Sequence, residues 1–207
     1  MATQLKVQLV ADPDADSPRK WDNLGVMVGA HRRYEIGDED GIKKSVEFIR
    51  ERFNDERLEK MGFDETNVAS VEQALLLTGK VILLPLYLYD HSGLALSTNP
   101  FSCPFDSGKV GYIWVSKARV MAEYGGDWLT KEATERARNC LIGEVETYHQ
   151  YLSGDVWGFR VLDQDGDEVD SCWGFYGDDP MTNGMTGNLS DEAKQLIEAG
   201  KFERLYS

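Results

Sequence analysis

At 207 residues, with 42% hydrophobic and 11% aromatic side chains, the chain is long enough to bury a core without disulfides, which excludes a wholly disordered protein. Its 36 acidic residues outnumber the 22 basic ones and give a formal charge of -14, which opposes direct binding to nucleic acid or to an anionic membrane. Residues 144–207 hold 14 of the acids and only 4 of the bases, so this acidic C-terminal third carries most of the charge.

Cys103, Cys140 and Cys172 are odd in number and widely spaced, so they predict free thiols in a reducing compartment. The N-terminus lacks a basic segment followed by an apolar one. The longest apolar run, residues 81–89, is far shorter than the roughly 20 residues of a membrane-spanning helix. We therefore expect a cytoplasmic protein that does not enter a membrane.

The first third of the chain predicts a strand, a long loop and two helices. Apolar and polar residues alternate over residues 5–9, as in a half-buried strand. Residues 12–41 contain two prolines and four glycines and predict a mobile loop. Apolar residues at helical spacing then predict helices at residues 41–53, behind the acidic cap Asp38-Glu39-Asp40, and at residues 66–78.

The middle of the chain predicts a hairpin and a further strand. Residues 81–89 have the composition of a buried strand, and Pro85 places it at a sheet edge or a bulge. A turn at residues 90–93 and a partner strand at residues 94–97 complete the hairpin. Residues 111–115 predict another strand.

Helix-capping residues organise the second half. Ser116, Thr130 and Ser190 each stand where an N-cap belongs, before a short helix, the longest helix and the last helix respectively. Asp165-Gly166, the pair favoured in a two-residue type I′ turn, predicts a hairpin of residues 156–164 and 167–175. That register places Leu162 opposite Val169 and Phe159 opposite Cys172. We expect one α+β domain over residues 1–207, with a mixed or antiparallel sheet, β-hairpins and about four to five helices.

Two groups of side chains have chemical potential. Cys103, His91 and Asp106 could form a thiolate nucleophile, its base and an orienting carboxylate, although the cysteine of a Cys-Pro loop between strands is more often a packed structural residue. His31-Arg32-Arg33 is a candidate anion-binding site, because guanidinium offers forked donors to phosphate or carboxylate. The alternative for this cluster is local ion pairing with Glu35, Asp38 and Glu39.

An acidic group in the C-terminal third is the strongest candidate for partner binding. Carboxylates this dense could engage a basic protein surface, the alternative being a solvated face that keeps the protein soluble. The group consists of Asp163, Asp165, Asp167, Glu168, Asp170, Asp178 and Asp179. The spacing of Asp163, Asp165 and Asp167 departs from a calcium loop further on, so we expect neither a metal nor a cofactor.

Four segments give the chain a family resemblance that covers most of residues 12–177. They are WDNLG at residues 21–25, HRRY at residues 31–34, LYLYDHSG at residues 86–93 and SCWGFYG at residues 171–177. On these segments the chain resembles a family of small acidic proteins encoded by bacteriophages and mobile elements. The resemblance implies an infected bacterial cytoplasm as the setting and transfers no catalytic residue.

From this setting and the charge we expect a non-enzymatic protein that binds and modulates a host or defence factor with a basic surface. The alternative is a cysteine-dependent enzyme, or a protein that binds a small ligand or nucleotide through residues 90–108 or through Arg32 and Arg33. The sequence leaves the oligomeric state open.

Overall fold

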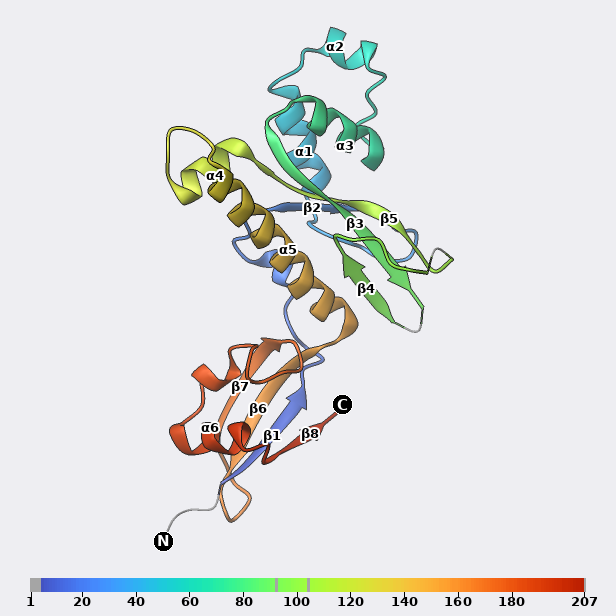
Figure 1. The fold of residues 1–207 in the computed structure, drawn as a ribbon. Coiled ribbons are helices and arrows are strands. Elements are labelled where there is room, and N and C mark those ends of the chain that lie inside the picture. The colour runs from blue at the N-terminus through green and yellow to red at the C-terminus, as the bar shows by residue number, and fades with distance from the viewer. Residues whose placement is uncertain (1–4, 92, 104, 207) are drawn as a thin grey trace. The chain divides into compact units, whose positions relative to one another are not determined.

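The structure is a computed structural model that describes residues 5–91, 93–103 and 105–206. Within these residues it contains six α-helices, two short 3-10 helices and two four-stranded sheets, which confirms the predicted α+β class (Figure 1). The chain divides into two compact units where we expected one domain. We call residues 1–18 and 147–207 the terminal unit and residues 19–146 the inserted unit.

The division follows from how the sheet of the terminal unit is assembled. Its strands run in the order β7-β6-β1-β8, with β1 antiparallel to β6 and parallel to β8. They are β1 (Lys6–Ala11), β6 (Val156–Leu162), β7 (Glu168–Tyr176) and β8 (Phe202–Leu205). Because β1 comes from the N-terminus and its partners from the C-terminus, everything between them forms an insertion with a sheet of its own.

One face of the terminal sheet is closed by the last α-helix, α6 (Asp191–Glu198), and the 3-10 helix η2 (Met185–Gly187). Alternate residues of β1 and β6 supply the sheet side of this core, as the alternation in residues 5–9 predicts. The buried set is Val7, Leu9, Trp157, Phe159, Val161, Phe175, Met185, Ala193 and Ile197.

The predicted hairpin forms between β6 and β7, with a longer turn than expected. The turn spans residues 163–167, with Gly166 at a φ of 88°. Phe159 pairs with Cys172 as predicted, but Leu162 pairs with Glu168 and not with Val169. The reason is an irregularity in β7, where Val169 is an extra residue that no residue of β6 opposes.

The inserted unit is built on an antiparallel sheet in the order β2-β5-β3-β4. Its strands are β2 (Val26–Gly29), β3 (Val81–Asp90), β4 (Leu94–Ser97) and β5 (Ser107–Ser116). Strand β2 and the 3-10 helix η1 (Pro18–Lys20) correct the expectation that residues 12–41 form one long loop. The predicted turn at residues 90–93 includes Ser92, which lies outside the described residues.

Pro85, which has no backbone N–H to donate, lies where β3, in the described sheet, has a neighbouring strand on only one side. Strand β3 is an interior strand, yet β4 pairs only with its residues 87–90, so beside Pro85 the described strands leave one side open. A register shift follows directly between Leu86 and Tyr87. The predicted edge and bulge therefore both occur here, within a strand that gains its second neighbour only after the proline.

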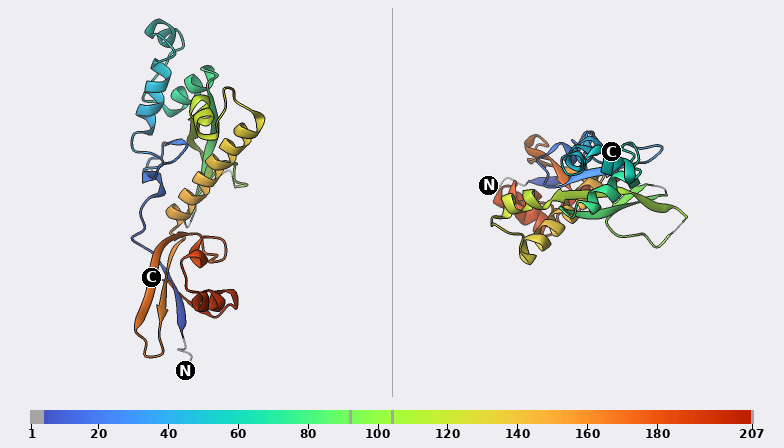
Figure 2. Two further views of the ribbon diagram at one scale, coloured as in Figure 1. Left: turned by 90° about the vertical axis from the view of Figure 1, so that its left-hand side faces the viewer. Right: turned by 90° about the horizontal axis from the view of Figure 1, so that it is seen from above.

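Helices cover both faces of this sheet (Figures 1 and 2). Helices α1 (Gly41–Arg50), α2 (Asp55–Lys60) and α3 (Val68–Leu77) pack on one face through a core that includes Ile49, Leu75 and Trp114. The long helix α5 (Lys131–Ser153) packs on the opposite face, where Leu141 and Ile113 both lie against Gly25. Helix α4 (Lys117–Tyr124) follows β5 directly.

Candidate functional site

A pocket of about 390 Å³ in the inserted unit brings two of the sequence candidates together. Its lining includes the anion-binding candidates His31, Arg32 and Arg33. It also includes Asp106 and residues 107–108, from the region considered for a small ligand. The sequence treats these as separate sites, whereas the fold makes them one.

The pocket forms because the ends of three strands meet. Tyr89, near the end of β3, pairs with Ser107 at the start of β5. Strand β2 ends beside β5 as well, where the Ala30 N–H donates to the Val110 carbonyl at 2.8 Å. The basic segment at residues 31–33 leaves β2 at this point and therefore reaches the loop that precedes β5.

Charges in the pocket are partly paired. Arg33 forms an ion pair with Asp90, whose side chain is 21% exposed. Arg32 is exposed and forms no ion pair with the residues that the structure describes. The His31 ring stacks on Tyr34 with centroids 5.0 Å apart. The ion pair of Arg33 thus crosses the pocket and does not involve an acid near it in the sequence, while its guanidinium also lies 5.5 Å from the ring centroid of Tyr34.

Cys103, His91 and Asp106 are brought together, with the carboxylate in the middle. The Cys103 thiol donates to Asp106 Oδ2 at 3.4 Å, and His91 Nδ1 lies 3.6 Å from the same oxygen. A cysteine nucleophile needs the imidazole beside the sulfur, with the carboxylate behind it. In the described residues the thiol hydrogen-bonds to the carboxylate, so the order of contacts differs from that of a nucleophile.

Four of the seven acids proposed for partner binding have local roles. The Asp163 carboxylate accepts the backbone N–H groups of Asp165 and Asp167 at 2.9 and 3.0 Å, closing the hairpin turn. Asp179 similarly accepts the N–H of Met181 at 2.9 Å. These two carboxylates stabilise turns.

Two more of the acids form ion pairs. Glu168 accepts the guanidinium of Arg160 at 2.5 Å, and hydrogen bonds from Arg160 and Ser171 hold the pKa of Glu168 below its usual value. Asp178 lies 3.7 Å from Arg204. Asp165, Asp167 and Asp170 remain exposed, and their carboxylates have no ion-pair partner in the described ranges.

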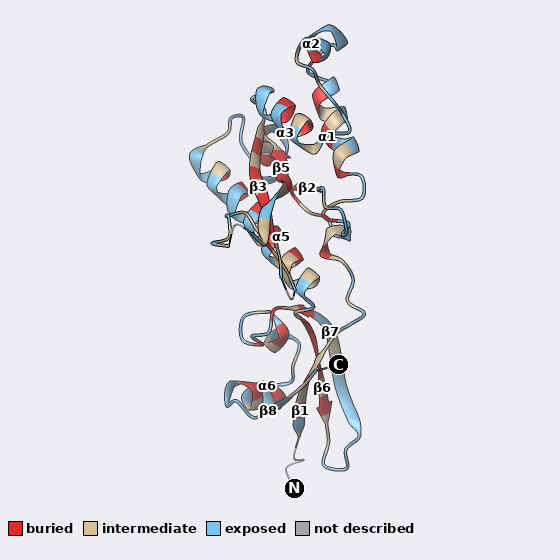
Figure 3. Ribbon diagram, turned by 90° about the vertical axis from the view of Figure 1, so that its right-hand side faces the viewer, coloured by how far each residue is buried: buried red, intermediate tan, exposed pale blue. Residues whose placement is uncertain are grey.

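The free acids lie on and beside an edge strand. Within the described sheet nothing pairs with the outer side of β7, and Figure 3 shows the strand exposed along most of its length. Two large apolar side chains accompany the acids: Val169 is 56% exposed and Trp173 46% exposed. Both occur where the pairing with β6 is irregular, and such bulges redirect side chains.

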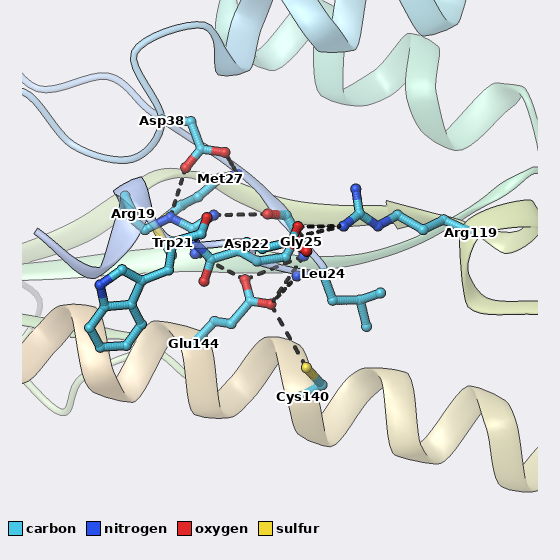
Figure 4. A network of polar contacts seen from close by, with 11 residues as sticks. Arg19, Trp21, Asp22, Leu24, Gly25, Met27, Asp38, Arg119, Cys140 and Glu144 are labelled. Carbon is cyan, nitrogen blue, oxygen red and sulfur yellow. Dashed lines mark hydrogen bonds and ion pairs between the residues drawn. The ribbon is translucent and has the colours of Figure 1, made fainter. Parts of the chain in front are cut away.

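Sequence reasoning missed a buried charge network in the inserted unit (Figure 4). Arg19, only 5% exposed, donates from Nε to Asp38 at 2.7 Å and from Nη1 to Glu144 at 2.9 Å. Burial acts to lower the pKa of Arg19, but the hydrogen bonds and charges of Asp38 and Glu144 raise it above its usual value. The arginine therefore stays charged inside the protein.

The network ties three separate segments together. Glu144 Oε1 accepts the backbone N–H groups of Leu24 and Gly25 at 2.8 and 3.1 Å. Asp38 accepts the N–H of Met27 at 3.1 Å and so does not cap α1 as the sequence suggested; the N-cap, Asp40, makes no side-chain cap bond. The carboxylate of Asp38 binds Arg19 and not the N-terminus of α1, because the buried charge of the arginine must be compensated.

Cys140 extends this network as a thiol. Its Sγ lies 3.8 Å from Glu144 Oε1, and burial together with the charge of Glu144 raises the pKa of Cys140. The raised pKa keeps the sulfur protonated, so that it donates toward the carboxylate. At the other end of the network, Arg119 donates to the backbone carbonyl of Asn23 at 3.0 Å.

No group of three or more His, Cys, Asp or Glu side chains within the described ranges is arranged to hold a metal ion. None of the helices in the described part of the chain combines the length and apolar composition needed to cross a membrane.

Comparisons of the chain with models of protein families, with curated proteins and with solved structures found no match.

Proposed function

We propose that the protein binds a basic surface of another protein through the exposed edge formed by β7 and its turn. We call this surface the acidic edge and define it by Asp165, Asp167, Val169, Asp170 and Trp173. The observation that carries the proposal is the combination of three unpaired carboxylates with two exposed apolar side chains on one edge strand and its turn.

The charges and the apolar groups have different roles in this proposal. Exposed carboxylates steer a basic partner and orient it, but each exposed ion pair contributes only about 0.5 kcal/mol. Most of the affinity must therefore come from apolar anchors, for which tryptophan is the side chain best suited. Trp173 lies directly over Gly158, since a Cβ added there would lie 2.3 Å from the indole. This backing by the sheet restrains the ring while half of it stays exposed.

The bulges in β7 favour side-chain contacts over the addition of a strand. An added strand needs a regular row of N–H and C=O groups, and bulges interrupt that row. In β7 the pairing with β6 shifts twice, and Gly174 has a φ of 84°. We therefore propose a folded basic surface as the partner and not an extended peptide.

The resemblance to bacteriophage and mobile-element proteins supports a bacterial partner. In that setting the partner is a host or defence factor, and binding blocks or redirects it. No bond is made or broken in this activity.

The test uses the full-length protein immobilised for capture from a bacterial lysate. Captured proteins are identified by mass spectrometry, and the affinity of the most enriched basic protein is then measured at low and high salt. The key variant carries Asp165→Asn, Asp167→Asn and Asp170→Asn and leaves the turn carboxylate of Asp163 in place. This variant loses three ion pairs with the partner, each contributing about 0.5 kcal/mol, so it should bind about tenfold more weakly and with a flatter salt dependence.

A matched control removes the same charge elsewhere. Glu59→Gln, Glu135→Gln and Glu198→Gln alter three exposed acids outside the acidic edge, and this variant should bind like the unaltered protein. Trp173→Ala should weaken binding at every salt concentration. Equal binding by the edge and control variants, or capture of no basic protein, would sink the proposal.

A further inference from the structure

The pocket lined by residues 31–33 and 105–108 combines features that none of its parts has alone. It contains an unpaired guanidinium, a second guanidinium held in place by an ion pair, and an aromatic ring that is almost fully exposed. We infer that this pocket binds a nucleotide, with the phosphate at Arg32 and Arg33 and the base against Phe105. This site is independent of the acidic edge, which belongs to the terminal unit.

Two arginines form the phosphate end of the proposed site. Arg32 has no ion-pair partner in the described chain, so its five N–H donors are available to a ligand. Arg33 uses part of its guanidinium to pair with Asp90, and this ion pair holds the side chain at the pocket. Two guanidinium groups with one of them prepositioned suit a phosphate, which accepts paired, charge-assisted hydrogen bonds.

Phe105 forms the base end of the proposed site. This ring is 94% exposed, the highest exposure among the large hydrophobic side chains described. An exposed aromatic ring gains from stacking on a nucleobase, because every base has a flat π-face and stacking tolerates all of them. Leu88 and Val110 add an apolar lining to the same pocket.

The carboxylates of the pocket limit which anions it accepts. Asp90 compensates Arg33, and Asp106 accepts the Cys103 thiol and lies 3.6 Å from His91. With a total charge of -14, the protein repels a long polyanion. A single nucleotide carries little charge, and a pocket of about 390 Å³ lies within the size range of small-ligand sites.

The test is a calorimetric titration of the full-length protein with adenosine and guanosine monophosphate, with the nucleoside adenosine, and with inorganic phosphate. Both nucleotides should bind at least about tenfold more tightly than the nucleoside or phosphate, because each of these supplies only one end. Arg32→Ala should reduce nucleotide affinity about tenfold and leave nucleoside affinity unchanged. Phe105→Ala should reduce the affinity for nucleotide and nucleoside and leave phosphate unchanged.

Matched controls are available because both key residues are exposed. Arg138→Ala removes another exposed arginine, and Trp128→Ala removes another exposed aromatic ring, 71% exposed, outside the pocket. Both controls should bind nucleotide as the unaltered protein does. The inference is overturned if millimolar nucleotide gives no heat of binding, if phosphate alone binds as tightly, or if the pocket variants match their controls. Since neither pocket substitution touches the acidic edge, partner capture by Arg32→Ala stays normal in either case.

Discussion

Arg19 and Glu144 lie 125 positions apart in the chain, and Nη1 of the arginine donates to Oε2 of the glutamate at 2.9 Å. Their side chains are only 5% and 10% exposed. The pair joins the segment before β2 to helix α5 on one face of the sheet. Such a buried pair is costly to form, but removing one partner leaves buried polar groups of the other without their hydrogen bonds.

Glu144→Ala should therefore lower the free energy of unfolding by about 3–5 kcal/mol. Asp38 still pairs with Arg19, but the substitution removes the acceptor of Arg19 Nη1 and of the Leu24 and Gly25 N–H groups. Glu144→Gln should cost less, because an amide oxygen still accepts those bonds. Urea denaturation measures the stability of both Glu144 variants. The control is Glu56→Gln, which breaks an exposed ion pair with Lys60 and should change the free energy of unfolding by less than about 1 kcal/mol. Equal effects at Glu144 and Glu56 would contradict a structural role for the network.

Gly25→Ala should destabilise the protein by about 1–3 kcal/mol through overpacking. The new Cβ would lie 2.4 Å from Leu141 Cδ2 and 2.9 Å from Ile113, both of which are fully buried. Gly143→Ala is the matched control, since nothing lies within 4 Å of its Cβ position in α5. Alanine is the better helix former there and should stabilise the protein by about 0.5–1 kcal/mol. Thermal unfolding of the two variants should shift in opposite directions.

Tyr112 should make the protein sensitive to alkaline pH. Burial raises the pKa of Tyr112 to about 12, with a smaller opposing effect from Ser45 and a further increase from the charge of Glu72. The unfolded chain loses this proton near pH 10 and the folded chain only near pH 12. The stability that the neutral phenol contributes is therefore complete below pH 10 and is lost as pH rises through 12.

Tyr112→Phe tests this pH dependence. In the described residues the buried Tyr112 hydroxyl has no hydrogen-bond partner, and the hydroxyl of nearby Ser45 donates to the Gly41 carbonyl. Removing an unsatisfied hydroxyl should raise stability at neutral pH by about 1 kcal/mol and reduce the loss between pH 10 and 12. Tyr206→Phe, at a position that is 75% exposed, should do neither. A steeper loss of stability between pH 10 and 12 in Tyr112→Phe than in the unaltered protein would contradict the assignment.

Asp163 should behave differently from the free acids of the acidic edge. Because its carboxylate accepts two backbone N–H groups of the hairpin turn, Asp163→Ala should cost about 1 kcal/mol of stability. Asp163→Asn keeps an acceptor and should lose less. Asp165→Asn, which removes no described hydrogen bond of its carboxylate, should leave the urea midpoint unchanged. A loss of stability in Asp165→Asn equal to that in Asp163→Ala would refute this division of the acids.

Features that depend on neighbours in the sequence were predictable. The hydroxyls of Ser116, Thr130 and Ser190 each accept the N–H three residues later, at 3.1, 3.0 and 3.3 Å, as N-caps do. Gly79 follows the C-cap of α3 with a φ of 64°, the left-handed conformation in which glycine commonly stands after a helix. Capping of these helices is decided within a few residues, so composition and spacing locate it. Asp38 is the exception, because the buried Arg19 holds its carboxylate.

Short strands that depend on distant partners were not predictable. Strands β2 and β8 have four residues each, and neither has a pattern that distinguishes it from a loop. Strand β8 exists because it pairs with β1, from Val7 beside Phe202 to Val10 beside Leu205. The bulges of β7 likewise moved Val169 out of its predicted register.

By itself the sequence determined the α+β class, the starts of α4, α5 and α6, the main hairpins and the concentration of acid in the C-terminal third, because each of these is local or compositional. Only the tertiary structure decided that the chain forms two units, that Arg19 is buried with Asp38 and Glu144, and that Arg32 and Phe105 line one pocket. It also separated the acids that close turns or pair with arginine from the three that stay free. The two units and the pair of Arg19 with Glu144 depend on contacts between segments more than one hundred residues apart, for which neighbouring residues carry no signal. The other outcomes depend on which side chains the fold buries or brings together.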